Sequence, residues 1–103
     1  MIRLVVTMVI KEGKMDAFLA ECKKIRPQVL AEKGCIMYDY HREIQSPLGS
    51  QEPVQKNRVT LLEAWESLDA LQEHTAAPHM KEFLARVKDM QESVTARVLE
   101  PAF

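Results

Sequence analysis

Hydrophobic residues follow two different patterns along this chain. Four short segments are rich in β-branched, aromatic and other apolar residues, which is typical of strands. They are residues 2–10, 35–44, 58–65 and 93–100. Elsewhere apolar residues recur at spacings of three and four, which gathers them on one face of a helix. This pattern predicts one long helix from Met15 to Leu30 and two shorter ones between Ser67 and Met90.

Proline, glycine and serine mark where these elements should begin and end. Pro27 lies within the first helix and cannot donate to the carbonyl of Lys23, which predicts a kink or an early stop near Arg26. Gly34 suits the left-handed position that ends helices. Ser67 is placed to cap a short helix, and Pro78 suits the first turn of the next one. Residues 46–57 form a breaker-rich loop, which is either a lid or a flexible insertion.

The predicted order of elements is strand, helix, strand, strand, helix, strand. This is the ferredoxin-like βαββαβ arrangement of the α+β class, with a four-stranded antiparallel sheet, in one domain over residues 1–103. Both helical arms of this topology cover the same face of the sheet. The other face carries Val5, Val9, Leu62 and Ala64, so it should need a second chain to cover it. We therefore expect a homodimer packed sheet to sheet.

Composition and charge exclude several classes of partner. With 14 Lys and Arg against 15 Asp and Glu, the chain has no basic stripe that could follow a nucleic acid. The longest nearly apolar run, Leu4 to Ile10, is far below the ~20 residues that span a bilayer, and no signal-peptide pattern is recognisable. Cys22 and Cys35 have no Cys-x-x-Cys partner and should be reduced thiols. We expect a cytoplasmic protein with no membrane or nucleic-acid partner.

The candidate chemistry gathers where the third strand turns into a helix. Glu63 and Trp65 end the strand, and His74 and His79 follow on the helices. A continuous helix would set the two histidines about 140° apart, and Pro78 interrupts it, which is poor geometry for a metal. The chain has only three glycines and no Gly-rich phosphate turn. An imidazole that titrates near neutral pH is a natural proton acceptor.

The order of these residues resembles the antibiotic biosynthesis monooxygenase family, and most closely its small bacterial quinol monooxygenase branch. The similarity rests on the segments 63–74 and 77–80, and extends to the turn 11–14, the helix end 32–35 and the tail 98–101. It implies a dimeric α/β barrel and oxygen insertion without metal, flavin or nicotinamide. In the implied mechanism a bound phenol loses its proton, and the phenolate passes an electron directly to dioxygen.

On this resemblance His74 is the candidate catalytic residue, as proton acceptor or stabiliser of the phenolate. The alternative for His74 is a solvent-facing position at a helix end. Trp65 either forms a wall of the substrate pocket or packs in the core. Glu63, on the same strand face, either binds substrate or tunes His74, or else pairs with a Lys or Arg.

Three further residues are candidates for substrate binding. Tyr38 and Tyr40 share one strand face with Ile36 and either present their hydroxyls to a substrate or pack across strands. His79 is either structural or an assistant to His74. His41 lies on the opposite strand face and is expected at the surface or in a dimer contact.

These observations support one main hypothesis and two alternatives. The main hypothesis is a cofactor-independent monooxygenase that oxidises a small quinol-like or polyphenolic compound with dioxygen. The alternatives are an isomerase of a small carbonyl or signalling metabolite, and a non-catalytic small-molecule-binding dimer. A haem role is a minor possibility, because the haem-degrading relatives use an Asn on the first strand where this chain offers Thr7.

Overall fold

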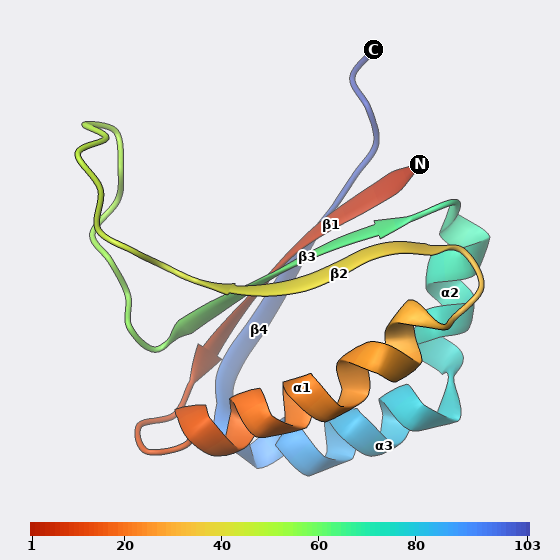
Figure 1. Cartoon of the computed structure of the whole chain (residues 1–103), viewed down its shortest axis with the longest axis horizontal. Coiled ribbons are helices and arrows are strands. Elements are labelled where there is room, and N and C mark those ends of the chain that lie inside the picture. Colours follow the sequence, from red (N-terminus) through yellow and green to blue (C-terminus); the bar gives the residue numbers. More distant parts are fainter.

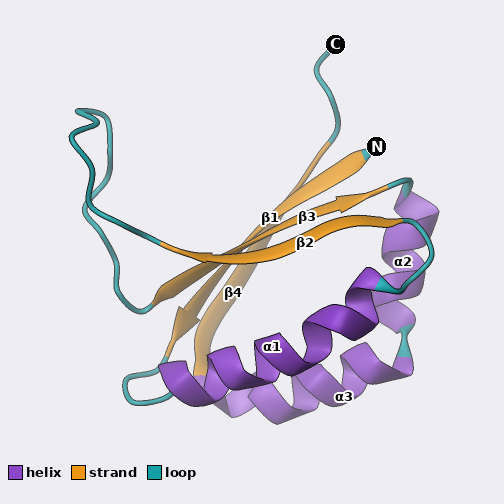
Figure 2. Ribbon diagram, viewed as in Figure 1, coloured by secondary structure: helices purple, strands orange, loops and turns teal.

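The computed structural model describes residues 1–103, and the chain folds as one antiparallel sheet with helices on one side (Figures 1 and 2). The elements are β1 Ile2–Ile10, α1 Met15–Leu30, β2 Cys35–Arg42, β3 Arg58–Trp65, α2 Leu68–Ala76, α3 Pro78–Val87, the 3₁₀ turn η1 Lys88–Met90 and β4 Gln91–Leu99. The strand order is β2-β3-β1-β4, and every neighbouring pair is antiparallel. The predicted ferredoxin-like α+β fold is confirmed.

The core lies between the sheet and the helices, because each strand directs alternate residues towards the helices. The buried inward-facing residues of β1 and β3 are Leu4, Val6, Met8, Ile10, Val59, Leu61, Glu63 and Trp65. The helices contribute Phe18, Cys22, Ile25 and Val29 from α1 and Met80, Phe83 and Val87 from α3. Each large apolar side chain buried in this way stabilises the fold by roughly 1.5–3 kcal/mol.

The outer face of the sheet is more mixed than the sequence pattern suggested. Val5, Val9 and Leu62 are only partly covered there, as expected. Thr7 lies between them, and it is in register with Thr60 on β3 and Thr95 on β4. A polar row therefore crosses the middle of the apolar surface.

Helix α1 continues through Pro27 to Leu30, so the early stop, one of the two outcomes expected near Arg26, does not occur. Pro27 lies in the last turn, and the N–H of Ala31 still bonds to the Pro27 carbonyl at 3.2 Å. Only the donor to the Lys23 carbonyl is lost. Burial of Ile25 and Val29 on either side of the proline holds the final turn against the sheet.

One element boundary and one side-chain direction also differ from the predictions. Helix α3 ends at Val87, and a 3₁₀ turn leads directly into β4 at Gln91. The pairing of β2 with β3 shifts between Cys35 and Met37, which turns Ile36 outward with 48% of its surface exposed. Ile36 was expected to share a face with Tyr38 and Tyr40, but this irregularity reverses its direction.

The loop between β2 and β3 projects away from the rest of the molecule (Figure 1). An ion pair between Glu43 and Arg58 closes its base, and the side chain of Gln51 bonds within it to Ser46 and to the carbonyl of Ile44. The loop is therefore organised by its own contacts. None of the helices combines the length and apolar character needed to cross a bilayer.

Candidate functional site

Three segments that are distant in the sequence meet at one carboxylate. Glu32 lies in the turn between α1 and β2, His74 near the end of α2, and His79 at the start of α3. The Oε2 atom of Glu32 is 2.9 Å from Nδ1 of His74 and 2.8 Å from Nε2 of His79. Its Oε1 atom is 3.0 Å from the same Nδ1 of His74. One carboxylate thus forms hydrogen bonds with two imidazoles.

Local sequence features explain how Glu32 reaches the helices. Gly34 adopts φ +83°, and a Cβ placed on it would lie 2.6 Å from Cβ of Ala70 on α2. The absence of a side chain lets the turn pack directly against that helix. The Gly34 carbonyl also accepts a bond of 2.8 Å from the backbone N–H of Glu66.

Helix α2 is fixed at both ends, which sets the position of His74. The Oγ atom of Ser67 accepts a bond of 3.1 Å from the N–H of Ala70, so the predicted cap is confirmed. Pro78 occupies the first turn of α3 after an extended Ala77. This break between the helices changes the direction of the chain, and it brings His79 to the same carboxylate as His74.

The imidazole of His74 is buried, with 4% of its surface exposed. Its ring centroid lies 4.6 Å from that of Trp65 and 5.5 Å from that of Tyr38. Nδ1 is bonded to Glu32, and Nε2 has no protein partner. Because no fully buried side-chain nitrogen or oxygen is left unbonded, Nε2 must reach open space. With its Nδ1–H donated to a carboxylate, His74 presents an Nε2 lone pair as a base.

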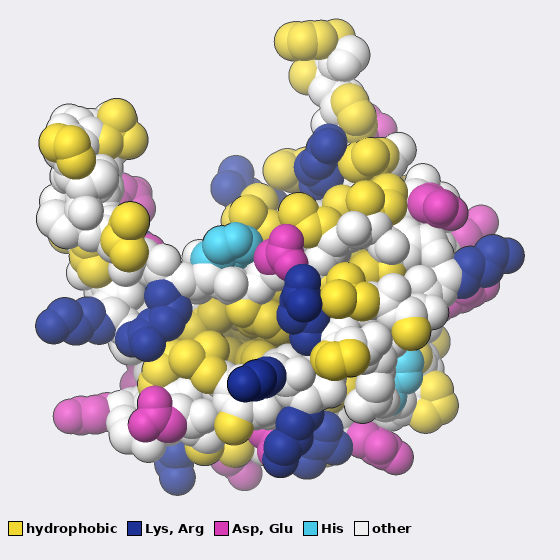
Figure 3. Space-filling view, viewed as in Figure 1, with side chains coloured by type: hydrophobic (Ala, Val, Ile, Leu, Met, Phe, Trp, Pro, Cys, Tyr) yellow, Lys and Arg dark blue, Asp and Glu magenta, His cyan; other side chains and the backbone are white.

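His74 lines a cavity of about 190 Å³ between the sheet and the helices. Its lining is mainly apolar, and the polar groups are few. They include Tyr38, Tyr40, Glu63 and His74. An apolar cavity of ~150 Å³ accommodates a benzene ring, so this one suits a small aromatic compound. Hydrophobic side chains are also visible in the hollow between β2 and α1 in Figure 3.

Glu63 is the acidic group of the cavity itself. Its Oε1 atom accepts a bond of 2.9 Å from Nε1 of Trp65, and no Lys or Arg pairs with it. Burial raises the pKa of the Glu63 carboxyl above its usual value, although the Trp65 bond and the nearby His74 act in the opposite direction. This favours a neutral Glu63, which can donate a hydrogen bond to a ligand.

The two tyrosines form one wall of the cavity. Tyr38 and Tyr40 meet edge to face, with ring centroids 5.6 Å apart. Burial raises the pKa of each phenol, so both remain protonated and able to donate hydrogen bonds. Burial likewise raises the pKa of the neighbouring Cys22 thiol to about 12, which leaves it an unreactive free thiol.

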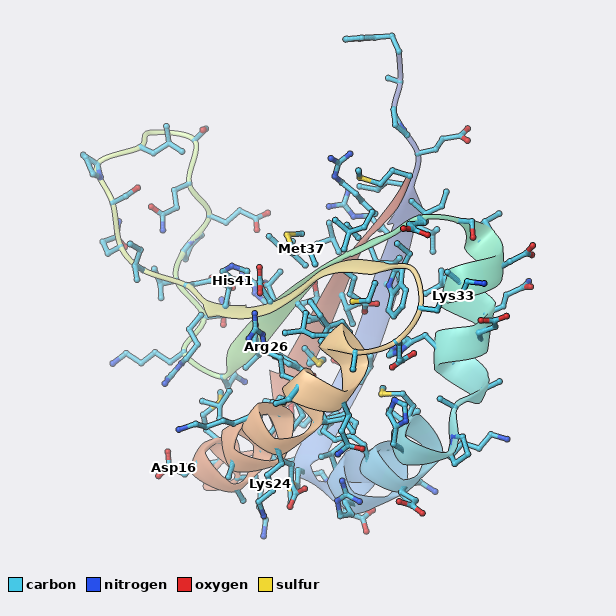
Figure 4. All side chains as sticks on the ribbon, turned by 45° about the vertical axis from the view of Figure 1, so that its right-hand side comes forward. Asp16, Lys24, Arg26, Lys33, Met37 and His41 are labelled. Carbon is cyan, nitrogen blue, oxygen red and sulfur yellow. The ribbon has the colours of Figure 1, made fainter.

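The remaining predicted site residues lie outside the cavity. Trp65 is completely buried and packs behind His74 without lining the cavity. His79 does not line it either, and its side chain bonds to Glu32. His41 and Met37 project from β2 away from the helices, whereas Arg26 reaches from α1 to Asp39 (Figure 4).

Sequence reasoning missed the role of Glu32. The signal available was the helix end at residues 32–35, which formed part of the family resemblance but carried no chemical feature of its own. A glutamate after a helix is most often a solvated surface residue. Only the folded chain reveals that two histidines more than forty positions later point at it, at sequence separations of 42 and 47.

The fold and site together define a small α+β domain with an imidazole–carboxylate pair at an apolar cavity. Comparison with known proteins shows to which family this domain belongs. The model of the antibiotic biosynthesis monooxygenase family matches residues 1–86, and the chain belongs to this family.

One relative by sequence and two solved structures are similar to the chain. The chain is 33% identical over 87 residues to the Escherichia coli K12 protein "Probable quinol monooxygenase YgiN", covering 84% of this chain and 82% of that protein. A conserved protein from Methanosarcina mazei Go1 superimposes with a TM-score of 0.83 at 24% identity, over 96% of this chain and 90% of the other. A structure of an antibiotic biosynthesis monooxygenase gives 0.83 at 18% identity, over the whole of both chains. The two structures support the fold alone.

Proposed function

We propose that this protein is a cofactor-independent monooxygenase that oxidises a small quinol-like or polyphenolic compound with dioxygen. The observation that carries the proposal is His74, whose Nδ1 atom bonds to Glu32 and whose side chain lines a small apolar cavity. Membership of the monooxygenase family and similarity to YgiN support the reaction type.

The first step is removal of a proton from a phenolic hydroxyl. The substrate ring lies among the apolar residues of the cavity, with one hydroxyl directed at Nε2 of His74. His74 accepts the proton, and Glu32 stabilises the imidazolium through the Nδ1–H bond. Neutral Glu63 and the phenols of Tyr38 and Tyr40 donate hydrogen bonds to the substrate oxygens.

The second step is oxidation of the phenolate by dioxygen. One electron passes from phenolate to O₂, giving a phenoxyl radical and superoxide, and these combine to form a carbon–peroxide bond. Cleavage of the O–O bond leaves one oxygen on the ring as a carbonyl and releases the other as water. For a hydroquinol the balance is QH₂ + O₂ → hydroxyquinone + H₂O. The substrate supplies all the electrons, so no separate reductant takes part.

The direct test is oxygen uptake with a panel of hydroquinols, using protein whose metal and flavin contents have been measured. We expect uptake well above autoxidation, and a loss of roughly 100-fold or more in His74→Ala. Glu73→Ala, at an exposed position of α2, is the surface control and should retain full activity. Uptake equal to autoxidation and unchanged in His74→Ala would refute the proposal.

One observation also favours an isomerase of a small carbonyl compound. The cavity combines a base, His74, with a carboxyl, Glu63, whose pKa is raised by burial. Such a pair can remove a proton beside a carbonyl and protonate its oxygen. Proton exchange of a carbonyl substrate into D₂O without oxygen uptake, lost in both His74→Ala and Glu63→Gln, would identify this activity in place of oxygenation.

We further propose that the protein works as a homodimer. The partly exposed Val5, Val9 and Leu62 on the outer face of the sheet offer an apolar surface for a second copy. Light scattering coupled to size exclusion should then give twice the mass of the 11.8 kDa chain. A charge on that surface, such as Val5→Glu, should produce monomers, and a wild-type monomer would contradict the proposal.

A further inference from the structure

The cluster of His74, Glu32 and His79 contains one more imidazole than the proposed chemistry requires. His79 does not line the cavity, yet its Nε2 atom is only 2.8 Å from Glu32. The same oxygen, Oε2, is 2.9 Å from Nδ1 of His74. A single carboxylate oxygen is therefore shared between a histidine at the cavity and one outside it.

A carboxylate with two histidines can neutralise only one positive charge. The first proton taken up by the pair is stabilised by Glu32, and a second is opposed by the first imidazolium across the shared oxygen. The two histidines consequently compete for the same carboxylate oxygen. Which ring holds the first proton determines whether His74 can accept a proton from the substrate.

The two imidazole rings differ in burial. The side chain of His79 is 27% exposed, whereas that of His74 is 5% exposed. Removing an imidazolium from water is costly, so the charge favours the more solvated ring. A neutral His74 can donate its Nδ1–H to Glu32 and keep its Nε2 lone pair.

The other ionisable groups near the cluster do not reverse this order. Glu63 on β3 interacts electrostatically with both His74 and Glu32, and a charged Glu63 would draw a proton to His74. Burial raises the pKa of Glu63, however, which weakens that pull. Tyr38 and Cys35 on β2 also interact electrostatically with Glu32. Burial raises the pKa of each, which favours their neutral forms.

We propose that His79 is a positioning residue that carries the positive charge of this cluster and thereby keeps His74 in its neutral, proton-accepting form. The inference rests on the proposed function for its catalytic meaning, because a neutral His74 is the base of the first step. Its physical content, the division of one proton between two rings, is independent of turnover.

Side-chain ¹⁵N NMR of the histidines tests the inference directly. In wild-type protein near neutral pH, we expect His74 as the neutral Nδ1–H tautomer, with the imidazolium signal at His79. Two variants separate charge from hydrogen bonding. His79→Gln keeps an N–H donor but cannot be charged, and His79→Arg keeps a permanent cation.

The expected results differ between these variants. In His79→Gln, the ratio of charged to neutral His74 at fixed pH should rise by roughly tenfold, because Glu32 is then free to stabilise a proton there. In His79→Arg, His74 should stay neutral. The surface control His41→Gln should leave the His74 signals unchanged. A wild-type spectrum with His74 charged and His79 neutral overturns the inference, as does a His79→Gln spectrum identical to wild type.

Kinetics separate this inference from the proposed function. If the protein oxidises hydroquinols, the acid limb of the kcat/KM profile should move to higher pH in His79→Gln and stay in place in His79→Arg. Turnover that depends on His74, with equal profiles in wild type and His79→Gln, would overturn the role of His79 alone. NMR spectra as expected in a protein without oxygen uptake would overturn the proposed function alone.

Discussion

Two glutamates lie near His74, and their surroundings differ. Glu32, on the turn between α1 and β2, is bonded to two imidazoles. Glu63, at the end of β3, is bonded only to the neutral indole N–H of Trp65. Burial raises the pKa of Glu63, which has no cationic partner. The same residue type thus meets two imidazoles in one place and a single indole in the other.

The comparison shows how a small domain can give two carboxyl groups near one histidine different hydrogen-bond partners. Glu32 has the partners that stabilise a charge, and it contacts the nitrogen of His74 that faces away from the cavity. Glu63 lines the cavity and can meet the substrate as a donor. Four substitutions test this difference between the two glutamates.

Loss of the charge of Glu32 should have the largest effect. Glu32→Gln retains a hydrogen-bond acceptor but no longer stabilises the His74 imidazolium, and its amide can present N–H to Nδ1 and reverse the tautomer. We expect kcat for hydroquinol oxidation to fall by roughly 100-fold or more. Glu73→Gln, at an exposed position of α2, is the matched control and should match wild type. Equal rates in the two variants would exclude a role for Glu32 in catalysis.

Displacement of Glu32 through the backbone should come next. Gly34→Ala introduces a Cβ at φ +83° and 2.6 Å from Cβ of Ala70. We expect a loss of about 2–4 kcal/mol in the free energy of unfolding, from backbone strain and overpacking together. Gly13→Ala is the control, since Gly13 has φ +79° but open space around it, and it should lose only about 1–2 kcal/mol. Urea denaturation measures both, and equal losses would show that the contact with α2 is unimportant.

Removal of the indole donor should affect Glu63 and leave Glu32 in place. Trp65→Phe deletes the Nε1–H bond and leaves a small void, which should cost about 1–3 kcal/mol. The pKa of Glu63 should then rise further, because the bond that lowered it is gone. A double-mutant cycle with Glu63→Gln isolates the pair. Strictly additive losses in that cycle would show that the bond contributes nothing.

Replacement of Glu63 itself should give the smallest effect, and one that depends on pH. A carboxyl whose pKa is higher in the folded than in the unfolded chain binds more protons when folded, so stability falls as pH rises above the ordinary value of 4.5. Glu63→Gln removes this dependence. Relative to the variant, wild type should therefore lose stability as the pH rises from 4.5 to 7. A difference that grows in favour of wild type over that range would contradict the raised pKa.

Local patterns were sufficient to predict most of the fold. Alternating burial along β1 and β3, the cap at Ser67 and the left-handed Gly34 follow from side-chain periodicity and backbone preference alone. The errors occurred where tertiary contacts override a local rule. Val29 holds the last turn of α1 beyond Pro27, and the irregular pairing of β2 with β3 turns Ile36 outward.

The candidate site was predictable only in part. His74, Glu63, Tyr38 and Tyr40 were singled out from one strand-to-helix corner and one strand face, and the structure brings all four to the cavity. Trp65 lies next to His74, and His79 bonds to Glu32, but neither residue lines the cavity. Glu32 has no distinguishing sequence feature, because its importance depends on two partners in other elements.

The amino-acid sequence by itself determined the order of the elements, the faces they bury and the family to which the chain belongs, because periodicity and turn chemistry act over a few residues. Only the tertiary structure decided that Glu32 joins two histidines and that Glu63 is left with an indole. Hydrogen-bond geometry and burial depend on distances between segments that packing alone brings together. The protonation of each acid, and with it the chemistry of His74, is therefore a property of the folded chain.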